Sequence, residues 1–252
     1  MWIIKTAAFL SASLFFLILA GCVRLAATVQ QNSFPAWTNG RITRAWGKTM
    51  LFILGISVTT VPTDETLDSM PALCVSNHQS YLDIIIFASL RPISFVAKKE
   101  VQGWVLLGWM ARLGGTIFID RDSLRGGVSA VRTLTTQLQQ NLSVHIFPES
   151  TSTNGSCILP FKPMLFTSAL EARTAILPMT IRYRSIDRVE VSPANRDIVC
   201  WHGTMEFLPH FFRLIRTRSI TAEVIHHPLI HPSPCDTART LAERSFTAVA
   251  SA

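Results

Sequence analysis

Apolar and polar positions along the chain follow two different periods, which predict helices and strands in alternation. Val128, Val131, Leu134 and Leu138 recur at intervals of three or four, so residues 123–142 are expected to form an amphipathic helix against a sheet. Short apolar runs bounded by turn residues are typical of buried strands. The sequence thus predicts strands at residues 73–76, 93–97, 116–119, 144–147, 175–183 and 219–226, with further helices at 81–90, 101–113, 163–172 and 237–248. This alternation indicates an α/β fold, with a mixed, largely parallel sheet flanked by helices.

The amino-terminal part of the chain is almost continuously apolar. From residue 1 to 27 the run is interrupted at Lys5 and Arg24, and the stretch between them approaches the roughly 20 residues that a membrane-spanning helix needs. More positive charge follows this stretch than precedes it, which places the bulk of the chain in the cytoplasm. A second apolar segment, residues 50–61, resembles an interfacial helix that leads into a strand. We therefore expect a membrane anchor over residues 1–60, transmembrane or monotopic, and one α/β domain over residues 61–252.

One short segment favours a different interpretation of the amino terminus. Residues 19–22, Leu-Ala-Gly-Cys, have the form of a bacterial lipoprotein cleavage site, which would make the apolar run a signal peptide and export the protein. Signal peptides open with positive charge, whereas here three apolar residues precede Lys5. The apolar run also continues past Cys22. An anchor is the favoured interpretation, and an exported lipoprotein is the alternative.

The composition supports a membrane location. The chain is 48% hydrophobic and only 15% charged, against about 25% charged residues in soluble domains. The net charge of +7 indicates attraction to anionic head groups or to a phosphorylated substrate. A nucleic-acid partner is not expected, because the chain has no Lys/Arg-rich run, no zinc-ligand spacing and no aromatic RNA-binding motif.

Cysteine and histidine usage gives no indication of a metal. The five cysteines are widely spaced, odd in number and without a C-x-x-C pair, which is typical of a reducing compartment without structural metal. His226, His227 and His231 are close in sequence, but Pro228 and Pro232 would break any helix that could align them. We expect no metal site.

The candidate chemistry centres on His78 and Asp83. His78 follows a predicted strand and precedes a predicted helix, which is where an α/β sheet usually places its active site. Asp83, in the first helical turn, could accept a hydrogen bond from Nδ1 of His78 and leave Nε2 free to take a proton from a hydroxyl. The alternative is a helix-capping aspartate beside a histidine that bonds to the backbone. No G-x-S-x-G turn supports a serine hydrolase.

A series of segments resembles the lysophosphatidate (glycerolipid) acyltransferase family. The first motif of that family is similar to N-H-Q-S-Y-L-D at residues 77–83. The second is similar to K-K-E at 98–100 followed by G-T-I-F-I-D-R at 115–121, the third to F-P-E-S-T at 147–151, and the fourth to I-L-P-M at 176–179. The resemblance extends over about residues 40 to 245, and the four motifs occur in the family's order.

This resemblance implies an H-x4-D acyltransferase that uses acyl-CoA or acyl carrier protein as co-substrate, without cofactor, metal or covalent acyl-enzyme. It assigns catalysis to His78 and Asp83. The substrate-binding residues that it implies are Lys98, Arg121, Glu149, Ser150 and Thr151. A thioester is already activated, so the reaction needs a base, a positive site for an anionic acceptor and donors for the oxyanion. From the residues alone, Arg121 could equally pair with a neighbouring aspartate, and Glu149 could be a helix-start carboxylate.

Two departures from the family pattern concern the acceptor. Ser150 replaces the usual glycine of the third motif, and Ser152 stands where an arginine often occurs. The segments 149–155, 159–162 and 201–205 resemble a subgroup that includes lyso-ornithine lipid acyltransferases. We expect acylation of the sn-2 hydroxyl of 1-acyl-glycerol-3-phosphate to phosphatidate, in phospholipid biosynthesis at the cytoplasmic face of a bacterial inner membrane. The alternatives are another lysolipid acceptor, such as lyso-ornithine lipid, or an exported lipoprotein or membrane-binding module without activity.

Overall fold

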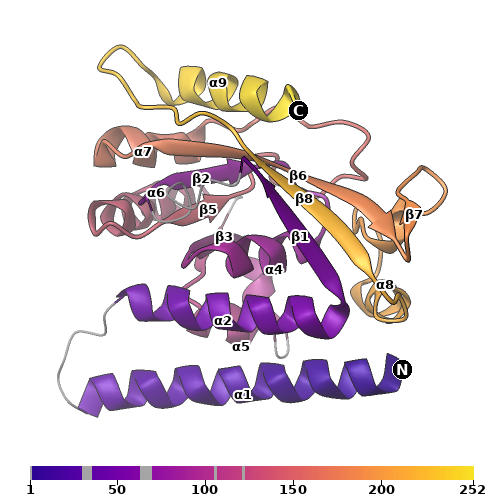
Figure 1. Ribbon diagram of the computed structural model, residues 1–252. Helices are drawn as coiled ribbons and strands as arrows, with labels where there is room; N and C mark the ends of the chain where they lie inside the picture. The colour runs from indigo at the N-terminus through magenta and orange to yellow at the C-terminus, as the bar shows by residue number, and fades with distance from the viewer. Residues whose placement is uncertain (1, 30–35, 63–69, 105–106, 121–122) are drawn as a thin grey trace.

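A single mixed sheet forms the centre of the molecule (Figure 1). The computed structural model describes residues 2–29, 36–62, 70–104, 107–120 and 123–252. The described strands are β1 (Ile56–Val61), β2 (Leu73–Ser76), β3 (Ser94–Lys98), β4 (Ile117–Ile119), β5 (Val144–Ile146), β6 (Ile176–Ile186), β7 (Val189–Glu190) and β8 (Ile220–His226). Their order is β1-β8-β6-β2-β5-β3-β4, with β7 beside β6. Only the pairs β6–β8 and β6–β7 are antiparallel, so the predicted mixed, largely parallel sheet is confirmed.

Helices cover both faces of this sheet and create two cores. One core packs against α2 (Ala36–Leu54), α4 (Tyr81–Leu90) and α8 (Phe207–Leu214), and the other against α6 (Leu124–Gln139), α7 (Thr167–Ala172) and α9 (Ala238–Ala250). Along β2, Cys74 faces the first core while Leu73 and Val75 face the second. Because β2 is buried on both sides, its sequence is uniformly apolar rather than alternating.

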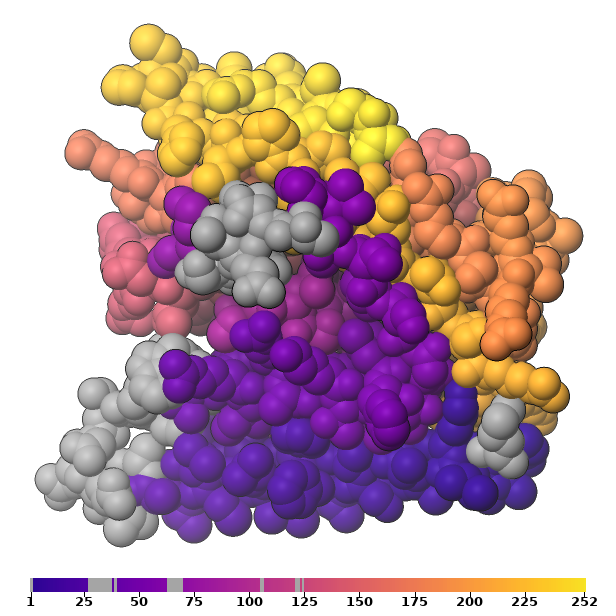
Figure 2. Space-filling model, viewed as in Figure 1, coloured from indigo at the N-terminus to yellow at the C-terminus, as the bar shows by residue number. Residues whose placement is uncertain are grey.

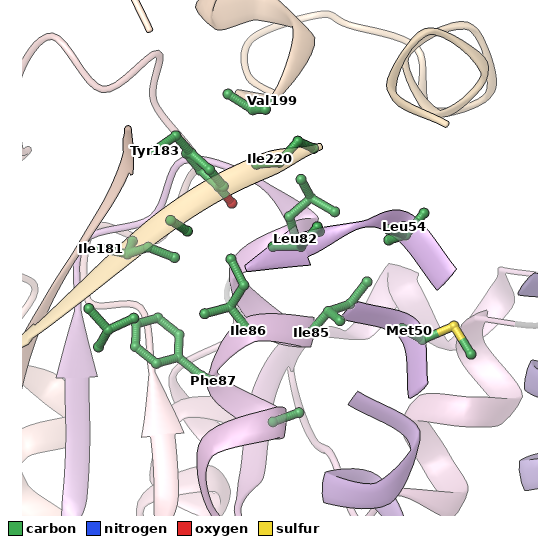
Figure 3. Packing of buried hydrophobic residues seen from close by; sticks show 14 of the residues in the cluster. Met50, Leu54, Leu82, Ile85, Ile86, Phe87, Ile181, Tyr183, Val199 and Ile220 are labelled. Carbon is green, nitrogen blue, oxygen red and sulfur yellow. The ribbon is translucent and has the colours of Figure 1, made fainter. Parts of the chain in front are cut away.

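The core between the sheet and α4 holds the element that follows the candidate histidine. Figure 3 shows Leu82, Ile85 and Ile86 of α4 packed between the sheet residue Ile181 and Met50 of α2. Each of these five side chains is at most 5% exposed. Burial of a side chain of this size contributes about 1.5–3 kcal/mol, so this contact fixes α4 firmly on the sheet.

Two glycines allow α2 to approach α4 and the segment that follows it closely. A Cβ atom added at Gly47 would lie 2.8 Å from the backbone nitrogen of Ser89 and 3.0 Å from the carbonyl oxygen of Ile85. One added at Gly40 would lie 3.0 Å from Cβ of Pro92. The obstacles at Gly47 are backbone atoms of α4, which cannot move aside without shifting the helix.

Helix α1 (Trp2–Val29) lies along the base of the molecule, beside α2 and opposite to it in direction (Figures 1 and 2). By length and composition alone, the segment Trp2–Ala26 of this helix could cross a membrane. Both ends are held to the body: Lys5 Nζ donates to the carbonyl oxygens of Leu54 and Thr217, each at 2.9 Å. Near the other end, Arg24 donates to the carbonyl oxygen of Arg112 at 3.0 Å. The helix therefore lies flat, with a long apolar face exposed.

Most predicted elements occur within a few residues of their expected bounds. The helix predicted over 101–113 is instead the 3-10 helix η1 (Lys99–Gly103) followed by α5 (Leu107–Leu113), which packs on α1. The helix predicted over 163–172 is η2 (Met164–Phe166) followed by α7. The short elements β7, η3 (Arg196–Ile198) and α8 were not predicted.

The division into an anchor over 1–60 and an α/β domain over 61–252 stays a prediction. Strand β1 lies across that boundary and pairs with β8 in the sheet. Residues 56–60 are therefore part of the same sheet as the rest of the α/β domain.

The close contact of α2 with α4 leads to a test with a matched control. Both Gly47 and Gly21 lie inside helices, so alanine improves helix propensity at either site by about 1 kcal/mol. Nothing lies within 4 Å of an added Cβ at Gly21. We expect Gly47→Ala to lower the unfolding free energy by about 1–3 kcal/mol, and Gly21→Ala to leave it unchanged or raise it. Thermal unfolding of both variants would measure this, and equal Tm values would contradict the close contact.

Candidate active site

Neighbouring parallel strands bring distant segments together at one edge of the sheet. Strands β2, β5, β3 and β4 run parallel to one another, so their carboxyl ends meet at that edge. His78 lies two residues after the end of β2, residues 147–151 follow β5, and Lys98 ends β3. This is the edge at which open α/β sheets usually bind their ligands.

The His78 imidazole and the Asp83 carboxylate form the expected pair. Nδ1 of His78 lies 2.8 Å from Oδ2 of Asp83. Since an ionised carboxylate only accepts, Nδ1 carries the proton and donates it, which leaves Nε2 as the basic nitrogen. The Asp83 side chain is fully buried, whereas that of His78 is 17% exposed. The imidazole can therefore be reached by a substrate, and the carboxylate that orients it cannot.

Three further donors fix the position of the Asp83 carboxylate. Oδ2 also accepts from the backbone N–H of Gln79 at 2.6 Å and of Ser80 at 2.9 Å. Oδ1 accepts from the Tyr183 hydroxyl at 2.6 Å. The aspartate thus caps the start of α4, as the alternative expected, and orients His78 at the same time; the imidazole bonds to this carboxylate and not, as the alternative expected, to the backbone.

Tyr183 comes from a strand that reaches past the end of its neighbour. Ser76, the last residue of β2, pairs with Met179, and β6 continues from there to Ile186. Tyr183 therefore lies beside the turn that carries His78. Burial, together with the neighbouring Asp83 charge, raises the pKa of Tyr183 well above its usual range, so the hydroxyl stays protonated and donates.

The turn between β2 and α4 is also fixed by its own side chains. Asn77 bonds in both directions with the backbone of Ile181, accepting at 2.8 Å and donating at 3.0 Å. Gln79 donates to the same carbonyl oxygen at 3.1 Å, and its own carbonyl accepts from the backbone N–H of Trp201 at 2.8 Å. The turn that carries His78 is therefore held by β6 on one side and by the segment before α8 on the other.

An aromatic ring supports the imidazole from behind. The ring of Phe147 stacks on that of His78, with centroids 4.0 Å apart and planes at 21°. His145 packs next to Phe147 and is fully buried, with Nε2 3.0 Å from the Ser76 hydroxyl. Burial lowers the pKa of His145 well below its usual range, so this second histidine is neutral and structural.

Glu149 binds backbone rather than lining a cavity. Oε1 accepts from the N–H of His78 and Oε2 from the N–H of Leu159, each at 2.7 Å. The side chain is 3% exposed, and burial raises the pKa of Glu149 although these two hydrogen bonds oppose the shift. Glu149 lies in a loop, so the helix-start interpretation is wrong. In this structure it joins the His78 backbone to the loop at 159, and a role in acceptor binding stays a prediction.

A large apolar pocket has His78 in its wall. It has a volume of about 710 Å³ and extends between α1, α2, α4 and α5. Phe9, Phe16 and Leu17 of α1 form part of its wall. The amino-terminal helix therefore belongs to the pocket as well as to the outer surface. A cavity of this size and character is suited to a hydrocarbon chain.

Four of the predicted residues line this pocket: His78, Lys98, Ser150 and Thr151. Asp83 lies behind His78, and Arg121 falls outside the described residues. Ser150 has a φ of 63°, in the left-handed region that favours glycine. The serine is therefore held in a conformation that glycine, the residue that the resemblance leads us to expect at this position, would adopt without strain. Sequence reasoning missed Tyr183, and also Tyr81 and Trp104 of the pocket wall.

Within the part of the chain that the structure describes, no three His, Cys, Asp or Glu side chains are grouped closely enough to hold a metal ion. His226 and His227 are buried near the end of β8, and His227 bonds to the Thr180 hydroxyl at 2.8 Å.

Comparison with known proteins agrees with this geometry. The model of the family described as Acyltransferase matches residues 58–182, which include the first, second, third and fourth motifs. Residues 58–182 therefore form an acyltransferase-family domain.

Similar members of the acyltransferase family differ in the acceptor that their names state. A lyso-ornithine lipid O-acyltransferase of Pseudomonas aeruginosa is 38% identical over 65% of this chain and 60% of its own length. One of Brucella abortus is 29% identical over 83% and 82%. A 1-acyl-sn-glycerol-3-phosphate acyltransferase of Neisseria gonorrhoeae is 40% identical over 44% of each chain. The matched segment thus spans less than two thirds of the Pseudomonas and Neisseria relatives.

A solved structure shares the fold of this chain. It is the crystal structure of the 1-acyl-sn-glycerophosphate (LPA) acyltransferase PlsC from Thermotoga maritima, with a TM-score of 0.65 over 98% of this chain and 95% of that chain. At 18% identity the likeness concerns the fold alone. The apolar helix α1 and the names of the relatives together suggest association with a membrane.

The Tyr183–Asp83 hydrogen bond generates a prediction. Tyr183→Phe removes a donor to a buried carboxylate and should lower the unfolding free energy by about 1.5–3 kcal/mol. The matched control is Tyr81→Phe, which removes a neutral hydrogen bond between the Tyr81 hydroxyl and His210 at 2.9 Å and should cost about 0.5–1.5 kcal/mol. Denaturant unfolding of both variants compares the two losses. A smaller loss for Tyr183→Phe than for Tyr81→Phe would contradict the role of Tyr183.

Proposed function

We propose that the chain transfers a fatty-acyl group from a thioester donor to a hydroxyl group of a lysolipid. The observation that carries this proposal is the His78–Asp83 pair, with Nε2 of His78 left basic and His78 in the wall of an apolar pocket. A base beside a pocket for a hydrocarbon chain is what a thioester-to-hydroxyl transfer requires. The donor would be acyl-CoA or acyl carrier protein, and the reaction would need neither cofactor nor metal.

The proposed reaction begins with the acceptor hydroxyl hydrogen-bonded to Nε2 of His78. The imidazole takes the hydroxyl proton as the oxygen attacks the thioester carbonyl carbon, and Asp83 stabilises the imidazolium that forms. The tetrahedral intermediate then collapses, the carbon–sulfur bond breaks, and the imidazolium returns the proton to the leaving thiolate. The products are an ester and a free thiol, and His78 is restored.

We propose a zwitterionic lysolipid of the lyso-ornithine type as the preferred acceptor. Among the described residues that line the pocket, Lys98 carries the permanent positive charge and Glu100 the negative one, so their charges balance. Ser152, where the family often has arginine, also lines the pocket. The names of the Pseudomonas and Brucella relatives support this choice.

The second candidate acceptor is 1-acyl-glycerol-3-phosphate, giving phosphatidate in phospholipid biosynthesis. The name of the Neisseria relative supports it, as does Arg121, which could bind a phosphate in bidentate fashion.

We propose that the protein lies on the cytoplasmic face of the membrane, with α1 in the interface as an uncleaved anchor. The exposed side of α1 is apolar, and its two basic ends are held to the body. The proposed donors, acyl-CoA and acyl carrier protein, are cytoplasmic, which supports an active site on that side. Intact-mass measurement of protein extracted from membranes should find the amino terminus at Met1 or Trp2. A diacylated amino-terminal Cys22 would instead support an exported lipoprotein.

Loss of the base should abolish the activity without unfolding the protein. We expect His78→Ala to reduce kcat by about 10²–10⁴-fold, with a smaller reduction for Asp83→Asn, which removes the orienting charge but keeps a hydrogen-bonding shape. The exposed His231 offers a matched control, and His231→Ala should leave kcat unchanged. Purified proteins would be assayed with a radiolabelled acyl thioester and either lysolipid.

Two outcomes of this assay would contradict the proposal. Near-normal turnover by a folded His78→Ala variant would exclude His78 as the base. A wild-type protein that acylates no lysolipid, although it binds membranes, would favour a membrane-binding module without activity.

A further inference from the structure

Four aromatic rings from three separate segments meet at the pocket. Tyr81 begins α4, Trp104 follows η1, and Trp201 and Phe207 lie before and within α8. The Tyr81 ring lies edge-on to those of Trp201 and Phe207, with centroids 6.0 and 5.0 Å away. The Trp104 ring contacts the same two rings at 6.3 and 5.8 Å. We refer to these four residues as the aromatic cluster.

The aromatic cluster is part of the wall that contains His78. All four residues line the same pocket as His78, and Trp104 is 37% exposed. Two of them are attached directly to the catalytic turn: Tyr81 follows it in sequence, and the backbone N–H of Trp201 donates to the carbonyl of Gln79 at 2.8 Å. The cluster is therefore attached to the turn that carries His78, the residue to which the acceptor hydroxyl must bind.

An exposed carboxylate accompanies the cluster. Glu100 lies in η1, four residues before Trp104, and lines the same pocket. Lys98, at the end of β3, precedes η1 and also lines the pocket. One short segment thus presents a cation, an anion and an aromatic ring to the cavity that holds the base.

This combination suits a particular kind of head group. Aromatic faces attract ammonium groups through the negative potential of the ring, and a nearby carboxylate adds to that attraction. The same carboxylate repels a phosphate monoester. An amino-acid head group, with one ammonium and one carboxylate, matches both charges of the segment, whereas a phosphate monoester matches only Lys98.

We propose that Glu100 and the aromatic cluster form a subsite for the free ammonium group of the acceptor, with Lys98 placed for its carboxylate. This rests on the proposed lysolipid acyltransferase function and adds to it the residues that determine the acceptor. The subsite selects against lysophosphatidate through Glu100 and in favour of an amino-acid lysolipid through the rings. It acts on acceptor binding and leaves the donor and His78 unaffected.

The test measures KM for both acceptors in full-length protein. Trp104→Leu removes the ring and keeps an apolar side chain, and Glu100→Gln removes only the charge. The KM for lyso-ornithine lipid should rise about three- to tenfold in each variant, while the donor KM stays constant. Trp104→Phe, which keeps an aromatic face, should restore much of the loss. The controls are Trp109→Leu and Glu190→Gln, both at exposed residues that do not line the pocket.

A modified acceptor makes the test specific for the ammonium group. Lyso-ornithine lipid whose free amine is acetylated has the same shape near the hydroxyl but lacks the positive charge. The wild-type KM for it should rise to about the level of the variants, and the variants should show little further increase, because the interaction is already absent.

The outcomes separate this subsite from the underlying function. If the wild type acylates lyso-ornithine lipid but Trp104→Leu and Glu100→Gln keep its KM, the subsite is wrong and the lysolipid acyltransferase function stands. An equal rise in KM for lyso-ornithine lipid and lysophosphatidate would also overturn the subsite, because the residues would then line the pocket without distinguishing between the two acceptors. Activity on lysophosphatidate alone overturns the subsite, and a wild type inactive on both lipids overturns the function itself.

Discussion

The buried carboxylate of Asp83 is the group on which the rest of the site depends. A charge at a fully buried position is stable only if donors replace the water it has lost, and here four donors do so. They come from the imidazole, from two backbone N–H groups of the turn and from a tyrosine of β6. Each donor thereby becomes fixed in space, so the same charge that orients His78 also orders the turn and attaches it to the sheet.

The hydrogen bonds to Asp83 and to its turn depend on the different lengths of β2 and β6. Strand β2 is short, so its end leaves room for the turn, while β6 is long and supplies partners beyond that end. Ile181 offers backbone groups to Asn77 and Gln79, and Tyr183 reaches the carboxylate. The site is therefore a product of the mismatch between two neighbouring parallel strands.

The sheet and the His78–Asp83 pair could be predicted from the sequence, because both depend on residues that are close together along the chain. The alternation of apolar runs predicted the sheet, and the strand–turn–helix position of His78 with Asp83 predicted the pair, which lies at hydrogen-bond distance. What could not be predicted depends on contacts between distant segments. Tyr183 is separated from Asp83 by 100 residues, and no periodicity marks it. The contact of Glu149 with two backbone N–H groups likewise depends on a loop path that side-chain identity does not encode.

The two apolar sides of helix α1 have a further, mechanical consequence for the pocket. Phe9, Phe16 and Leu17 border the pocket, whereas Leu14, Phe15 and Ile18 face outward from the same helix. Because both sets of side chains belong to one continuous helix, a displacement of the outward side of α1 also changes the volume of the pocket. In a bilayer, lateral pressure and thickness would act on the outward side. Wherever the outward side of α1 meets lipid, the width of the pocket would therefore depend on the thickness and lateral pressure of that lipid.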